Sequence, residues 1–235
     1  MTLTPRQNNN VNDLNNKALS GLFGFVLTLA FCVFVPAWTV DYWQVWVLLS
    51  VLSLSLLAIT LYLMKKDPRL LERRLRAGPR AETQQSQKIG QRFGALAFLA
   101  TFVLPALDHR FAWSAVPAPV VLSGEVLVVM GLLIVFLVFR ENTFTSATIE
   151  IAAEQRVVSS GPYSIVRHPM YVGALLMMLG IPLALGSWWG TATLVPMTWV
   201  IVRRVRNEEE LLARGLTGYR EYREQVRYRL LPLVW

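Results

Sequence analysis

Cysteine and histidine, the residues most often used for disulfides and metal sites, are almost absent from this chain of 235 residues. The single cysteine, Cys32, has no partner for an internal disulfide. The two histidines occur in no HExxH spacing, so no metal site is expected. None of the 14 glycines forms a GxG pair, which excludes a dinucleotide fingerprint, and the GxSxG spacing of serine hydrolases is missing.

Charged residues are scarce as well. They make up 16% of the chain, against about 25% in soluble domains. Hydrophobic residues make up 54%, and the mean hydropathy is +0.43. This composition excludes an ordinary soluble domain, and it excludes a disordered chain because disorder requires low hydrophobicity.

Long apolar segments take the place of the missing charges. The segments 18–40 and 42–64 each hold 23 residues without Asp, Glu, Lys or Arg. As helices they would be about 35 Å long, enough to cross roughly 30 Å of hydrocarbon. Shorter segments follow at 93–107 and 119–139. The second is interrupted only by Glu125, which we expect to snorkel to the outer interface.

Residues 168–202 form a further segment without Asp, Glu, Lys or Arg, with a Gly-rich turn at 186–190. It predicts a helical hairpin whose arms, about 24 Å or less, barely reach the far interface. We therefore expect an all-α integral membrane protein with five or six transmembrane helices and a cytoplasmic helix after the hairpin. Residues 1–235 would form one membrane domain, with residues 1–17 as a flexible tail.

The basic residues orient this arrangement. With the threading above, 22 of the 23 Lys and Arg residues fall on one side of the membrane. The positive-inside rule assigns that side to the cytoplasm, so both termini are expected there. The net charge of +8 is then a consequence of membrane orientation and requires no nucleic-acid partner.

Residues that can carry chemistry gather on either side of the hairpin. Pro169 biases His168 away from helical dihedrals and suits a first helical position, which holds His168 at the N-terminus of a membrane helix. The free N–H groups and the dipole of such a terminus favour an anion. The second arm returns to the same level at Glu208 and Glu209. An anion-preferring helix start and paired carboxylates would face each other there.

S-adenosylmethionine suits such an arrangement, because it carries a carboxylate, an ammonium and a sulfonium. Tyr163 and Tyr171 could pack against its adenine. Methyl transfer is an in-line displacement governed by alignment and electrostatics, so it requires little further catalytic machinery. The pattern therefore indicates a methyl-donor site.

Four motifs add a family resemblance. The segments 161–163 (GPY), 167–171 (RHPMY), 208–209 (EE) and 219–222 (YREY) resemble the isoprenylcysteine carboxyl methyltransferase family. They are most similar to its short bacterial integral-membrane members. The likeness covers roughly residues 140–235. It implies an entirely helical methyltransferase that uses S-adenosylmethionine, located in the bacterial cytoplasmic membrane with its active site on the cytoplasmic side.

The resemblance also assigns roles. Residues 140–235 would form the cofactor-binding core, and four membrane helices within 18–139 would shape the cavity for a lipophilic acceptor from the bilayer. Arg204 stands where the eukaryotic enzymes have an arginine facing the acceptor. Independently of the resemblance, Glu209 is a second catalytic candidate, because some acceptors must lose a proton. The residues implied to bind the cofactor are Gln155, Val157, Val158, Tyr163, His168, Pro169, Tyr171 and Glu208.

Several alternatives stay open. An isoprenylcysteine-like carboxylate would need no base, whereas a phospholipid amine or a small thiol must lose a proton, for which Glu208 or Glu209 is available. The three glutamates at 208–210 leave open which one contacts the cofactor. Two other hypotheses are an NADPH-dependent sterol-type reductase, whose Lys-Tyr-Gly segment is missing from residues 212–222, and a non-catalytic membrane protein.

Overall fold

The computed structural model describes residues 5–75, 85–145 and 155–235, which form eight α-helices and two 3-10 helices without a strand. This confirms the all-α fold with a C-terminal hairpin followed by a further helix. The elements are α1 (Pro5–Ala37), α2 (Trp43–Lys66), α3 (Pro68–Leu75), α4 (Gln85–Phe111), α5 (Ala118–Glu141), η1 (Gly161–Ser164), α6 (Pro169–Ala184), η2 (Trp189–Thr193), α7 (Leu194–Gly215) and α8 (Tyr219–Gln225).

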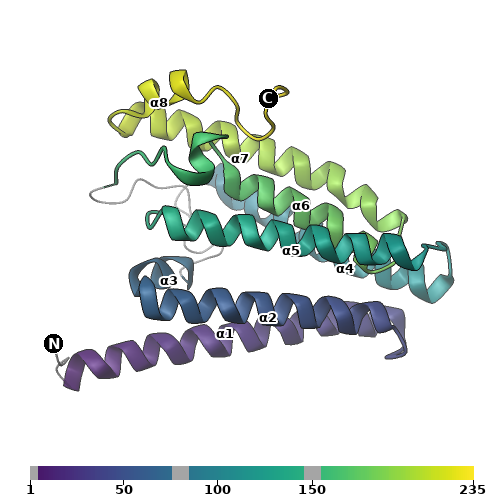
Figure 1. The fold of residues 1–235 in the computed structure, drawn as a ribbon. Coiled ribbons are helices and arrows are strands. Elements are labelled where there is room, and N and C mark those ends of the chain that lie inside the picture. The colour runs from purple at the N-terminus through teal and green to yellow at the C-terminus, as the bar shows by residue number, and fades with distance from the viewer. Residues whose placement is uncertain (1–4, 76–84, 146–154) are drawn as a thin grey trace.

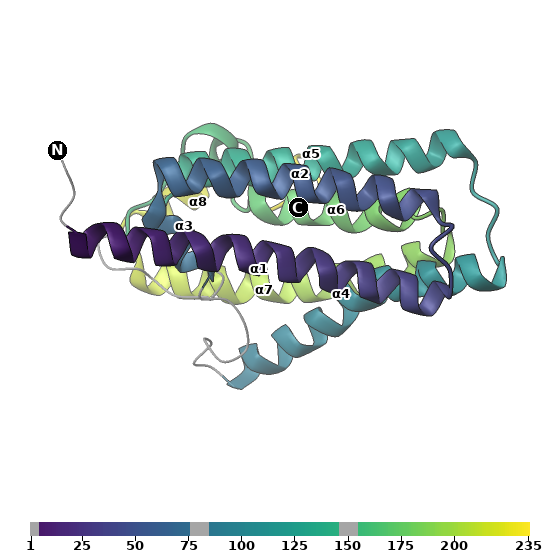
Figure 2. The same cartoon turned by 90° about the horizontal axis from the view of Figure 1, so that it is seen from below.

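The long helices run side by side in layers. Helices α1 and α2 form one layer, α5 and α6 pack above it with α4 behind them, and α7 lies on the outside with α8 and the C-terminus (Figure 1). The α1–α2, α4–α5 and α6–α7 connections all lie at one end of the bundle. Helix α3, η1 and α8 lie at the other end, as the view from below also shows (Figure 2).

Three helices are long and apolar enough to cross a membrane by length and composition, among the residues that the structure describes. They are the segment Val11–Ala37 of α1, then α2 and α5. Helix α6 is a shorter apolar helix. It nevertheless spans the same bundle, because its C-terminal end packs with the turns of the longer helices (Figure 1).

The tip of the hairpin is held at that end by a buried carboxylate. Asp108 of α4, 1% exposed, accepts hydrogen bonds from the backbone N–H and the hydroxyl of Ser114, both at 2.7 Å, and from the hydroxyl of Ser187. The Ser187 hydroxyl in turn accepts from the Gly190 N–H at 2.8 Å. The hairpin therefore reaches the level of the α4–α5 connection, the side that the charge distribution predicts to be extracytoplasmic.

Helices α5 and α6 approach each other through glycines. A Cβ atom on Gly131 of α5 would lie 2.5 Å from the Gly173 carbonyl oxygen, and one on Gly180 of α6 would lie 2.7 Å from the Gly124 carbonyl oxygen. Small residues let membrane helices pack with their backbones in contact. This close contact fixes the position of the N-terminus of α6, and therefore of His168, beside α5.

Two local expectations were wrong. Residues 5–17 continue helix α1 and are no loose tail, because an existing helix extends at little cost and the Lys17–Asp13 pair, at 2.6 Å, supports it. Glu125 does not snorkel, since it is 7% exposed and its carboxylate has no hydrogen-bond partner among the described residues. It shares the inward face of α5 with Val121 and Val128, whereas snorkelling requires an outward position.

Candidate functional site

One cavity lies where η1, the first turn of α6, the C-terminal half of α7 and α8 come together. Nine of the ten residues singled out from the sequence line it; only Glu209 does not. The lining residues with predicted roles are Gln155, Val157, Val158, Tyr163, His168, Pro169, Tyr171, Arg204 and Glu208. The structure thus brings together residues that are more than fifty positions apart in the chain.

The C-terminal segment positions the His168 backbone. Proline at the first helical position leaves His168 as the N-terminal cap of α6, with φ −126° and ψ 61°. Its N–H donates to the Arg229 carbonyl oxygen at 3.0 Å, and the preceding Arg167 N–H donates to the Tyr228 carbonyl oxygen at 2.9 Å. The backbone before α6 is therefore tied to residues that follow α8.

A buried ion cluster lies behind His168. The Glu209 carboxylate, 4% exposed, accepts from Arg167 Nε at 2.7 Å and from Arg229 Nε at 2.9 Å, and His168 Nε2 lies 3.3 Å from it. Burial by itself would raise the pKa of Glu209, but the hydrogen bonds from His168, Arg167 and Arg229 outweigh it and hold that pKa well below its usual range. Glu209 is consequently ionised at neutral pH.

The neighbouring Glu208 faces the cavity instead. Its carboxylate accepts from the Tyr171 hydroxyl at 2.8 Å, and that hydroxyl accepts from Arg204 Nε at 2.9 Å. His168 Nδ1 lies 4.0 Å from the same carboxylate. Because Glu208 keeps part of its side chain exposed to the cavity, it is a carboxylate that a ligand can reach.

Three tyrosines, Tyr163, Tyr219 and Tyr222, form another part of the cavity wall. The Tyr163 hydroxyl accepts from the Asn142 side-chain amide at 3.0 Å, and the Tyr222 hydroxyl donates to the Tyr163 carbonyl oxygen at 2.8 Å. Tyr219 also lines the cavity, is 4% exposed, and has a hydroxyl without a hydrogen-bond partner among the described residues. Burial raises its pKa, so this hydroxyl stays protonated and is available as a donor.

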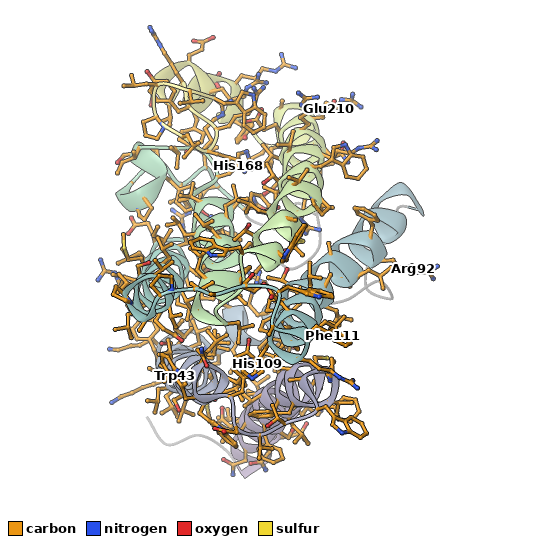
Figure 3. All side chains as sticks on the ribbon, turned by 90° about the vertical axis from the view of Figure 1, so that its right-hand side faces the viewer. Trp43, Arg92, His109, Phe111, His168 and Glu210 are labelled. Carbon is orange, nitrogen blue, oxygen red and sulfur yellow. The ribbon has the colours of Figure 1, made fainter. Side chains whose placement is uncertain are left out.

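The structure separates the three consecutive glutamates. Glu208 lines the cavity, Glu209 lies behind it among arginines, and Glu210 is exposed and 3.8 Å from Arg214. Figure 3 shows Glu210 at the outer edge of α7 and His168 on the side of α7 that faces α6. Glu209 therefore does not reach the cavity as a base positioned for a substrate would.

Some lining residues were missed from the sequence. Tyr219 and Tyr222 belong to the YREY motif but received no role, and Asn142 carried no signal, because a polar residue after a membrane helix is ordinary. The YREY spacing was the one available hint. No group of three or more metal-ligating side chains that could hold a metal occurs within residues 5–75, 85–145 and 155–235.

Comparisons with known proteins show a similarity to a methyltransferase family. Residues 120–217 match the family model described as phospholipid methyltransferase, which spans α5 to the end of α7. This match confirms the resemblance to methyltransferases that the motifs indicate, and it supports an enzyme of that class.

Two individual proteins are similar to about half of this chain. Delta(14)-sterol reductase TM7SF2 of Mus musculus is 28% identical over 141 residues, covering 51% of this chain and 33% of that protein. Cobalt-zinc-cadmium resistance protein CzcN of Cupriavidus metallidurans is 31% identical over 133 residues, covering 56% of this chain and 59% of that protein. The matches thus span one third and about three fifths of the relatives' own length.

Proposed function

We propose that this protein is an S-adenosylmethionine-dependent methyltransferase of the cytoplasmic membrane that methylates a lipophilic acceptor. The observation that carries the proposal is the cavity itself. It combines a helix N-terminus and an accessible carboxylate at Glu208, both within the segment that matches a methyltransferase family, with a buried Tyr219 hydroxyl that has no hydrogen-bond partner among the described residues. Residues 140–235 are its cofactor-binding core.

The residues of the cavity fit the chemistry of the methyl donor. Glu208 is suited to its ammonium, the N-terminal turn of α6 to its carboxylate, and the Tyr219 hydroxyl to an acceptor atom on the ligand. The rings of Tyr163 and Tyr171, with Val157 and Val158, offer apolar surface to its adenosine. The tyrosine rings also favour a nearby positive charge such as the sulfonium.

When bound, S-adenosylmethionine would supply the methyl group. A lone pair of the acceptor would form a bond to the methyl carbon, and the bond from that carbon to sulfur would break, leaving its electron pair on the thioether sulfur. Arg204 is suited to orienting an oxyanion on the acceptor. A carboxylate acceptor releases no proton. An amine or thiol acceptor does, and Glu208 is the lining carboxylate that could take it.

Glu209 enters this proposal as a positioning residue. It holds Arg167 and His168 from behind, and its depressed pKa makes it a poor proton acceptor. The catalytic role expected for Glu209 is therefore given to Glu208 where a base is required.

Calorimetric titration of the purified protein with S-adenosylmethionine in detergent tests the site. We expect the wild type to bind. Glu208→Gln should weaken binding by at least about tenfold, and Tyr219→Phe, which removes only the hydroxyl oxygen, should weaken it by about threefold or more. Glu210→Gln is the matched control, since Glu210 is adjacent in the chain but exposed. Wild-type affinity in both cavity variants would refute the site.

A nicotinamide-dependent reductase is the second candidate, favoured by the match to the sterol reductase relative. The same calorimetric experiment with NADPH distinguishes the two candidates. Binding of NADPH, with none of S-adenosylmethionine, would replace the methyltransferase proposal. If S-adenosylmethionine binds, incubation with the methyl-labelled compound and a native lipid extract would identify the acceptor by mass analysis.

A further inference from the structure

A second arginine, Arg74, comes from the N-terminal half of the chain and lies close enough to Arg204 for their charges to interact. Arg74 is near the end of α3, with Nη1 4.0 Å from Met170 Sδ and Cζ 5.1 Å from the centre of the Phe139 ring. Met170 lines the cavity, and the next residue, Tyr171, accepts the hydrogen bond from Arg204. Two guanidinium groups from opposite halves of the chain thus flank the first turn of α6.

Helix α3 is firmly held in this place. Its buried residues Leu70 and Leu71 belong to an apolar cluster with Phe139, against which Tyr163 and Met170 also pack. Figure 1 shows α3 at the same end of the bundle as η1 and α8.

The preceding arginine of α3 fixes another part of the cavity. Arg73 Nη1 donates to the Thr143 carbonyl oxygen at 2.6 Å, and its Cζ lies 5.7 Å from the Phe144 ring centre. Phe144 lines the cavity. Helix α3 therefore contacts the cavity wall at two points.

The charges at this edge favour an anion. Burial is the main factor that lowers the pKa of Arg74; the neighbouring Tyr171 opposes it, and the positive charge of Arg204 lowers it further. An anionic group bound next to both guanidiniums would be attracted by both positive charges. The planar fork of arginine matches the oxygens of carboxylates and phosphates.

We propose that Arg74 and Arg204 together bind the oxyanion headgroup of the lipid acceptor, a carboxylate or a phosphate. The proposal rests on the proposed function and deepens it. It makes Arg74 a residue that selects an anionic acceptor, and it gives the N-terminal half a direct part in that choice.

Binding of simple amphiphiles tests this site without the natural acceptor. Laurate, dodecyl phosphate and dodecyltrimethylammonium are titrated calorimetrically into the full chain in maltoside micelles. We expect one or both anionic amphiphiles to bind at least about tenfold more tightly than the cationic one. We expect Arg74→Gln and Arg204→Gln each to weaken anion binding by about tenfold or more. Arg69→Gln is the control, because Arg69 is an exposed arginine of the same helix.

Three further measurements make the test decisive. In Arg74→Gln, the affinity for S-adenosylmethionine is expected to stay within about threefold of wild type. If Arg74→Gln folds poorly, Arg74→Lys takes its place. This variant keeps the positive charge and should retain part of the anion binding. In a methyl-transfer assay with methyl-labelled S-adenosylmethionine and a native lipid extract, Arg74→Gln should raise KM for the acceptor and leave KM for the methyl donor unchanged.

The outcomes separate the two proposals. Anion binding in Arg74→Gln equal to wild type, or equal binding of the cationic amphiphile, overturns the arginine site. Inorganic phosphate binding as tightly as dodecyl phosphate overturns a lipid ligand. A preference between laurate and dodecyl phosphate distinguishes the two headgroups. Failure of the wild type to bind S-adenosylmethionine contradicts the proposed function and leaves the amphiphile result to be judged separately.

Discussion

At the scale of single residues, neighbouring side chains of identical chemistry have different roles. Successive residues on a helix point about 100° apart, so Glu208, Glu209 and Glu210 face a cavity, a buried arginine cluster and solvent in turn. The hydrogen bonds that Glu209 accepts in the buried cluster outweigh its burial and depress its pKa, and its place in that cluster keeps it away from the cavity. Residue type and spacing alone do not distinguish the three.

Replacing Glu209 should therefore destabilise the protein more than replacing Glu210. Glu209→Gln leaves Arg167, which is 7% exposed, without its anionic partner, and breaking such a buried pair costs about 3–5 kcal/mol. Glu210→Gln should cost less than about 1 kcal/mol, because its partner Arg214 is exposed. Thermal unfolding in detergent measures both, and equal melting temperatures for the two variants would contradict the structural role of Glu209.

The pH dependence follows from the same depressed pKa. A carboxyl whose pKa is lower in the folded state contributes stability above its unfolded pKa, about 4.3, and that stability is lost as pH falls toward its folded pKa. The difference in Tm between wild type and Glu209→Gln should stay constant from about pH 6 to 8 and narrow below about pH 4. A difference that narrows already between pH 8 and 6 would show that the pKa of Glu209 is not depressed.

At the scale of elements, the contact between α5 and α6 positions the site. The glycines at 124, 131, 173 and 180 bring the two backbones close together, and α6 begins directly after His168. The sequence analysis predicted both helices but attached no meaning to these glycines, because they do not form one short motif. Their pairing depends on how two separate helices align.

A methyl group added at this contact should disturb the site from a distance. Gly131→Ala places a Cβ 2.5 Å from the Gly173 carbonyl oxygen, and we expect a loss of about 1–3 kcal/mol together with weaker S-adenosylmethionine binding. Gly24→Ala in α1 is the control, since nothing lies within 4 Å of the added atom. Unfolding temperatures and calorimetry provide the comparison, and an unaffected Gly131→Ala variant would mean that the helices are not this close.

At the scale of the whole molecule, the cavity and the hairpin tip lie at opposite ends of the bundle (Figure 1). The positive-inside rule predicts that the cavity end faces the cytoplasm, the compartment that would supply the proposed S-adenosylmethionine. An acceptor from the bilayer and a soluble methyl donor would then reach one site from different directions.

Cysteine labelling tests this orientation. In a Cys32→Ala background, Thr217→Cys lies in the exposed α7–α8 connection and Ala115→Cys in the exposed α4–α5 connection. A membrane-impermeant reagent should label position 115 in intact spheroplasts and position 217 only in inverted vesicles. The reverse pattern would invert the proposed topology.

The sequence by itself determined the membrane character, the helical class and nine of the residues that line the cavity. Each of these depends on local composition, on the length of apolar segments and on short motifs such as RHPMY. Helix α3 was missed because two buried leucines in a charged segment are too weak a pattern to indicate a helix.

Only the tertiary structure decided the finer arrangement of the site. The place of Glu209 depends on Arg167 and Arg229, the His168 backbone on the C-terminal segment, and the position of Arg74 on the packing of α3 beneath Met170. These contacts join residues 20 to 96 positions apart. Their geometry is set by how whole helices pack together, which no local pattern encodes.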